Sequence, residues 1–95
     1  MKGFQKKYLR GLAHHLEPVV RVGKEGVSAG VLEAVQHALL DHELIKVRMR
    51  EPEDKKAMAR ALAEGSGSEL VGLIGHTAIL YKRHPDEPRI EVPER

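Results

Sequence analysis

A chain of 95 residues with 41% hydrophobic content makes one globular domain with a thin core. Its lack of cysteine excludes disulfides, cysteine-ligated zinc and a thiol nucleophile, and no apolar run approaches the roughly 18 residues of a membrane span. The net charge of +2 excludes nothing by itself, and the charged N-terminus is unlike a signal peptide, so we expect a cytoplasmic protein without membrane contact.

The first half of the chain predicts two helices with a strand between them. Residues 3–16 form the first helix, because large apolar side chains recur there every four residues and can face a core. These side chains are Phe4, Tyr8, Leu12 and Leu16, with Leu9 beside them. Pro18 ends this helix, and residues 19–22 form a short strand. After a turn with two glycines, Ser28 is a suitable N-cap for a second helix that runs to about His42.

Residues 44–50 predict a strand with one buried face and one solvated face, because apolar and cationic side chains alternate. The apolar side chains are Ile45, Val47 and Met49. The cations between them are Lys46, Arg48 and Arg50. We expect the first set to face the core and the second to face solvent.

The last part of the chain predicts a helix and a hairpin. The third helix covers about residues 52–64, with Pro52 in its first turn and Gly65 as its C-terminal stop. Residues 70–74 and 77–83 are two strands joined by a tight turn. Three prolines and several charges after this hairpin indicate an extended tail.

The elements therefore follow the order helix, strand, helix, strand, helix, strand, strand. Helices between strands require crossover connections, and the final hairpin supplies an antiparallel partner. We expect a compact α/β domain over residues 1–84, in which a four-stranded mixed sheet packs with three helices. Residues 85–95 form the tail.

Residues 21–28 have the parts of a phosphate cradle. A strand is followed by two glycines three residues apart and by a helix start, where first-turn N–H groups lack internal partners. The loop consists of Gly23, Lys24, Glu25 and Gly26. Glycines let the backbone approach a phosphate, and Lys24 adds a mobile cation, whereas Glu25 would repel phosphate and is expected to face away. Because such spacing also occurs in ordinary turns, a plain connection remains an alternative.

Positive charge is concentrated near the N-terminus. Residues 1–24 carry six basic side chains and one acidic one, whereas residues 25–95 carry ten basic and thirteen acidic ones. Such asymmetry indicates an end that faces a polyanion, although a solvated basic helix face gives the same pattern. The residues that would extend a track from the loop are Lys6, Lys7, Arg10, His14 and Arg21. Lys46 and Arg48 join this track if no helix covers their face of the sheet.

Neither metal binding nor catalysis is supported by the spacing of the polar residues. His37 and His42 are five residues apart, not the four that two helical ligands prefer. Ser66 and Ser68 lie in a glycine-rich turn that would not hold a catalytic triad rigidly. We therefore expect no metal, no cofactor and no enzymatic activity.

The aromatic content limits the expected mode of binding. The chain has one phenylalanine, two tyrosines and no tryptophan. Since Phe4 and Tyr8 are assigned to the core, no platform remains for stacking several bases. We expect binding to depend mainly on phosphate contacts and shape.

Two longer segments resemble a known family. Residues 11–50 read GLAHHLEPVVRVGKEGVSAGVLEAVQHALLDHELIKVRMR, and residues 74–83 read IGHTAILYKR. From about Lys6 to Arg83 the chain resembles the bacterial YhbY-type proteins, which consist of one CRM (chloroplast RNA splicing and ribosome maturation) domain. The resemblance implies a fold similar to the C-terminal domain of translation initiation factor 3. It also implies RNA binding, a functional loop at residues 23–26, and association with precursors of the large ribosomal subunit.

We therefore expect a monomeric, noncatalytic protein that binds ribosomal RNA during ribosome assembly. Two alternatives stay open: an Alba-like DNA-binding module, and a protein-docking adaptor on a ribosomal protein. Tight binding of duplex DNA by an obligate dimer would favour the first alternative. Salt-insensitive binding to a protein partner would favour the second.

Overall fold

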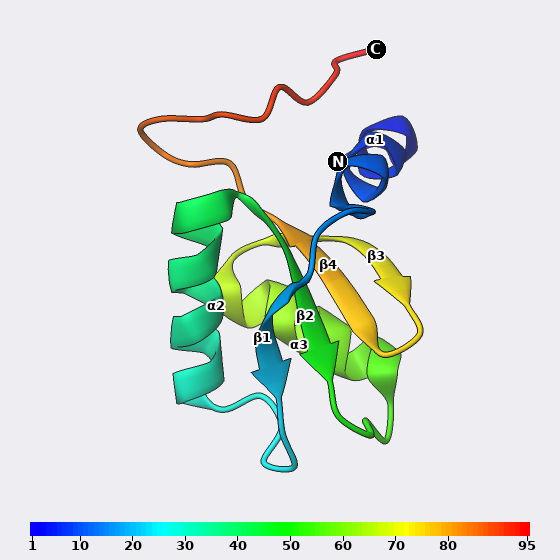
Figure 1. The fold of residues 1–95 in the computed structure, drawn as a ribbon, viewed down its shortest axis with the longest axis vertical. Helices are drawn as coiled ribbons and strands as arrows, with labels where there is room; N and C mark the ends of the chain where they lie inside the picture. The colour runs from blue at the N-terminus through cyan, green and yellow to red at the C-terminus, as the bar shows by residue number, and fades with distance from the viewer.

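Three helices and four strands follow one another in the predicted order in the computed structural model, which describes all residues 1–95. They are α1 (Gly3–Ala13), β1 (Pro18–Val22), α2 (Ala29–His42), β2 (Leu44–Met49), α3 (Lys55–Ser66), β3 (Glu69–Ile74) and β4 (Thr77–Tyr81). The strands form one sheet in the order β1-β2-β4-β3 (Figure 1). Because β1 is parallel to β2 and the other two pairings are antiparallel, the sheet is mixed, as predicted. None of the helices is long and apolar enough to cross a membrane.

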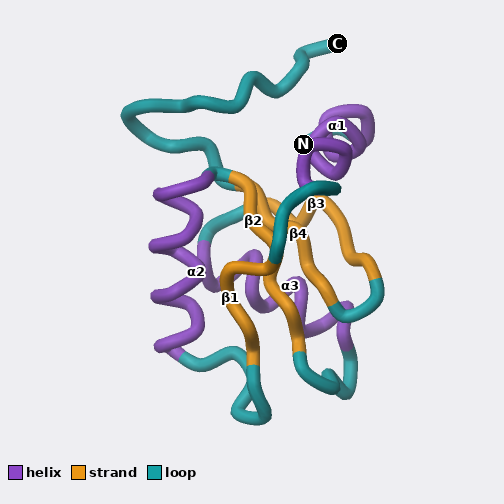
Figure 2. The backbone as a smooth tube through the Cα atoms, viewed as in Figure 1, coloured by secondary structure: helices purple, strands orange, loops and turns teal.

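The two faces of the sheet are covered unequally. α2 and α3 pack on one face, where a cluster of 12 buried residues includes Val35 and Leu39 of α2 and Leu62 of α3. On the opposite face, Leu9 and Ala13 of α1 join four sheet residues in a smaller cluster. The four sheet residues are Leu44, Val71, Ile79 and Tyr81. Since they lie toward one end of the strands, where Figure 2 also shows α1, the other end of this face is open.

The first helix is shorter than expected and turns a different face to the core. It ends at Ala13, not at residue 16, and the exposed fractions of Phe4, Tyr8 and Leu12 are 39%, 43% and 41%. The expectation that these three side chains face a core is therefore wrong, whereas Leu9, expected beside them, is buried. Leu9 and Ala13 are also four residues apart and are fully buried, so two different rows of this helix satisfy helical spacing.

The third helix begins and ends later than expected. It begins at Lys55, because Asp54 Oδ1 caps it by accepting a backbone N–H hydrogen bond of 3.0 Å. It continues through Gly65, the expected stop, and ends at Ser66, where Gly67 forms the C-cap with a left-handed φ of 69°. A Cβ atom at Gly65 would lie 2.7 Å from Leu32 Cδ1, so glycine at this position allows α2 and α3 to pack closely.

A buried carboxylate holds the segment that follows β4. Glu43, between α2 and β2, is fully buried and accepts hydrogen bonds from the backbone N–H groups of His84, Arg89 and Ile90 at 2.8, 2.7 and 2.9 Å. Burial raises the pKa of Glu43, but these hydrogen bonds and the charge of Arg89 outweigh burial and leave the pKa below its ordinary value. The segment then runs from the end of α2 toward α1 (Figure 1), where Ile90 packs against the smaller cluster. The division into a domain of residues 1–84 and a tail of residues 85–95 stays a prediction.

Candidate nucleic-acid interface

A tight turn at residues 23–26 follows β1. The N–H group of Gly26 donates to the carbonyl oxygen of Gly23 at 3.1 Å and closes the turn. Gly26 has a φ of 73°, a conformation that other residues adopt at a cost. Gly23 does not have a positive φ, and no heavy atom lies within 4 Å of the place a Cβ atom would take. The fold does not need glycine at position 23, and the exposed backbone there is open to a ligand.

The N-terminus of α2 lies directly after this turn. Ser28 donates its N–H group to the carbonyl oxygen of Gly26 at 3.0 Å, and its Oγ atom accepts from the N–H group of Val31 at 3.1 Å. The N–H groups of Ala29 and Gly30 are therefore the first-turn donors left without a partner in the helix. Both residues are exposed. Together with the positive end of the helix dipole, these donors can bind a phosphate oxygen.

A row of four paired residues crosses the open end of the sheet. In strand order the row consists of Arg21, Arg48, Thr77 and Ile74. Arg21 and Arg48, which we call the arginine pair, are exposed and directly opposite each other on β1 and β2. Like charges in such positions destabilise a sheet. Because a bound anion would relieve this repulsion, the arginine pair favours a polyanionic ligand.

A hollow of about 460 Å³ lies between the turn and the arginine pair. Its charged and polar lining comes from Arg21, Arg48, Arg50, Glu51 and His76, with the backbone of Gly23. Arg50 and His76 were not among the expected interface residues. Guanidinium groups donate hydrogen bonds in a geometry that matches phosphate, so the hollow is suited to a phosphate group.

The opposite side of the turn is acidic. Gly23 and Lys24 also border a second hollow toward α3, where the carboxylates of Glu53 and Asp54 lie. Arg50 and Glu51 stand between the two hollows and line both. The carboxylates of Glu53 and Asp54 repel a phosphate by Coulomb's law. A polyanion is therefore expected to approach the turn from the sheet side and not from α3.

Two of the expected cations are engaged within the protein. Arg10 Nη1 of α1 donates to the carbonyl oxygen of Val71 at 2.8 Å, which ties α1 to β3. Lys46 Nζ donates to the carbonyl oxygens of Leu16 at 3.0 Å and His14 at 3.5 Å, which ties β2 to the connection between α1 and β1. Both side chains are therefore already positioned by these bonds.

The remaining expected residues fall into two places. The turn, with Lys24 and Glu25 exposed, lies with the arginine pair at one end of the sheet (Figure 1). Lys7 is exposed and Lys6 half-buried on α1, and His14 is exposed just after it, all at the other end. The structure therefore brings the turn and the arginine pair together and sets the cations of α1 apart from them along one face.

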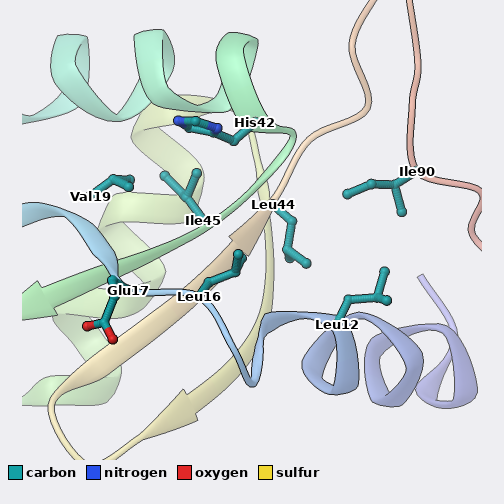
Figure 3. A pocket seen from close by; sticks show the side chains of 8 residues that line it. All are labelled: Leu12, Leu16, Glu17, Val19, His42, Leu44, Ile45 and Ile90. Atoms are coloured by element: carbon teal, nitrogen blue, oxygen red, sulfur yellow. The ribbon is translucent and has the colours of Figure 1, made fainter.

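An apolar groove of about 380 Å³ opens where α1, β1 and the tail meet (Figure 3). Its apolar lining consists of Leu12, Leu16, Val19, Leu44, Ile45 and Ile90. In Figure 3, Leu12 extends from α1 and Ile90 from the tail, with Leu44 between them. Glu17 and His42 complete the lining, and neither Lys nor Arg contributes, so the groove suits an apolar group and not a phosphate.

The histidines do not gather with carboxylates. No three His, Asp or Glu side chains come together in the way that metal ligands would. The rings of His14 and His15 lie 5.2 Å apart in an edge-to-face arrangement at the surface. Their position beside α1 places them at the border of the open face.

Known proteins resemble this chain over nearly its whole length. The family described as the CRS1 / YhbY (CRM) domain matches residues 1–82. The probable RNA-binding protein YqeI of Bacillus subtilis is 44% identical over 95 residues, which cover 98% of this chain and 99% of that protein. An RNA-binding protein of Haemophilus influenzae is 41% identical, with 96% and 93% covered. The solution structure of the hypothetical protein SAV1595 from Staphylococcus aureus superposes with a TM-score of 0.85 at 37% identity, with 98% and 99% covered.

Proposed function

This chain belongs to the CRS1/YhbY (CRM) domain family, and from this premise we propose that it is a noncatalytic RNA-binding protein. The names of the relatives from Bacillus subtilis and Haemophilus influenzae support RNA as the ligand. The arginine pair carries the proposal in this chain, because it places two like charges side by side on an exposed face. The turn at residues 23–26 and the start of α2 hold one phosphate, and the arginine pair holds the next.

The RNA we propose is ribosomal, in precursors of the large subunit, and the protein acts there as a cytoplasmic monomer during ribosome assembly. The resemblance to YhbY-type proteins supports this target. Sedimentation of cell extracts in a sucrose gradient tests it. The protein is expected in the fractions of large-subunit precursors and not with mature subunits, and an even distribution over both would contradict this target.

Replacing Gly23 by alanine is expected to weaken RNA binding about tenfold, or about 1.4 kcal/mol. The added Cβ atom has free space within the protein but occupies the surface that the phosphate approaches. The dissociation constant for ribosomal RNA, measured over a salt series, checks the effect. The melting temperature is expected to stay unchanged.

Ala61→Ser is the matched control, because it also adds one heavy atom at an exposed position and lies on α3, which packs on the opposite face of the sheet. This variant is expected to bind RNA as the wild type does. If Gly23→Ala also binds as the wild type does, the turn is only a connection between β1 and α2.

A further inference from the structure

α1 presents an aromatic surface to solvent. Phe4 and Tyr8 are 39% and 43% exposed and lie one helical turn apart, so their Cβ atoms are neighbours at about 5–6 Å. Leu9 and Ala13 anchor the helix on the sheet with fully buried side chains. The exposure of the two rings therefore belongs to a helix that is fixed in place. Binding mainly through phosphate contacts was expected because both rings were assigned to the core, and their exposure removes this reason.

The charges around these rings favour a polyanion over a protein partner. Residues 1–16 contain no aspartate or glutamate, and Glu17 is the first acidic residue of the chain. Lys7 is exposed and lies between the two rings in sequence, and Arg10 follows on the next turn. Aromatic rings interleaved with cations are the arrangement by which proteins hold single-stranded nucleic acid, since every base has a face that can stack.

α1, which carries the aromatic surface, packs on the sheet face of the arginine pair but at the other end of the strands. Between the two, Arg10 is bonded to β3 and Lys46 to the chain after α1. An RNA strand that leaves the arginine pair toward α1 thus passes further cations before it meets the rings.

We infer that Phe4 and Tyr8 stack unpaired bases of the RNA whose phosphates bind at the turn and the arginine pair. This inference rests on the proposed function and adds base contacts to it. The ligand class is single-stranded RNA, and α1 is the part of the protein that distinguishes it from a paired duplex. The aliphatic side chain of Leu12 continues this surface toward the apolar groove.

The test replaces each ring by an aliphatic side chain of similar apolarity, in Phe4→Leu and Tyr8→Leu. One probe is an oligoadenylate of about 12 nucleotides, a length within the site sizes of single-strand binders, and the other is its abasic counterpart with the same phosphates. Each substitution is expected to weaken binding of the oligoadenylate about fivefold or more and to leave the weaker binding of the abasic strand unchanged. Leu40→Ala, on an exposed site of α2, is the control that should change neither.

Tyrosine fluorescence gives a second readout. The chain has no tryptophan, and its other tyrosine, Tyr81, is 5% exposed. The oligoadenylate is therefore expected to quench the emission of Tyr8, and Tyr8→Leu should lose this quenching. Quenching that follows protein concentration without RNA would overturn the inference, because a second copy would then cover the rings.

The outcomes separate the inference from the function on which it rests. If the wild type binds both probes with the same salt-dependent affinity and the leucine variants match it, the base contacts are wrong and the phosphate site stands. If the wild type binds ribosomal RNA in a salt-dependent manner but neither probe, the inference fails and the proposed function stands. If it does not bind ribosomal RNA either, the proposed function fails and the inference with it.

Discussion

Replacing Arg21 and Arg48 together by glutamine is expected to weaken RNA binding about a hundredfold while leaving the protein as stable as before, or more stable. Two lost guanidinium–phosphate contacts of about 1.5 kcal/mol each make about 3 kcal/mol, which corresponds to this factor. Removing the repulsion between two paired like charges is worth up to about 1 kcal/mol to the fold. RNA titrations and urea denaturation of the same samples measure both effects.

The matched control is the double variant Lys56→Gln and Arg60→Gln. These residues are exposed on α3, which packs on the opposite face of the sheet, and their replacement changes the net charge by the same amount. This control is expected to lose only the nonspecific part of the attraction. The plot of log affinity against log salt has a negative slope, and its magnitude should be smaller by about 1.5 in the arginine variant, as for two lost phosphate contacts. Equal losses in both double variants would show that net charge alone drives binding.

Local patterns in the sequence were sufficient for the order of the elements and for parts of the interface. The alternation that begins at Ile45 correctly predicted that Val47 and Met49 are buried and that Arg48 is exposed. Arg50 continued this alternation and could have been included in the interface. His76 could not, because only the folded sheet shows that the turn between β3 and β4 lies beside the end of β2, where Met49 N–H donates to the His76 carbonyl oxygen at 2.8 Å.

These patterns could not predict which residues of distant strands pair, nor which face of a helix is buried. Arg48 lies in a segment with readable alternation and Arg21 in a short predicted strand, but the register that sets them opposite each other is a property of the sheet. On α1, the exposed row that begins at Phe4 and the buried row of Leu9 and Ala13 have the same spacing, so periodicity could not choose between them. That choice also decided whether aromatic rings were available to RNA.

The role of Glu43 was missed for a related reason. Its hydrogen-bond partners are the N–H groups of residues 84, 89 and 90, more than forty positions later in the chain. No local spacing marks such a partner. The available signal was a carboxylate placed between the end of a helix and a strand of buried residues, where an unpaired charge would be costly.

Replacing Glu43 by glutamine is expected to destabilise the protein by about 3 kcal/mol. One carboxylate oxygen becomes an NH₂ group that cannot accept, and the remaining hydrogen bonds lose their charge assistance. The melting temperature should fall by about 15 °C, as expected for a chain of this size. Hydrogen exchange should accelerate first at the amides of His84, Arg89 and Ile90, because the tail loses its attachment before the core opens.

The dependence of stability on pH distinguishes the charge of Glu43 from other reasons why Glu43→Gln would be less stable. Because the pKa of Glu43 is lowered in the folded protein, its contribution is fully present above its ordinary value of 4.5 and is lost as the pH falls through the lower, folded value. Wild-type stability should therefore fall below about pH 4.5 more steeply than that of Glu43→Gln. Glu33→Gln, an exposed change on α2, should follow the wild type. Glu43 has a positive φ of 63°, which glycine adopts without strain. If Glu43→Gly is more stable than the wild type, backbone strain at this position outweighs the hydrogen bonds that the Glu43 carboxylate accepts from the tail.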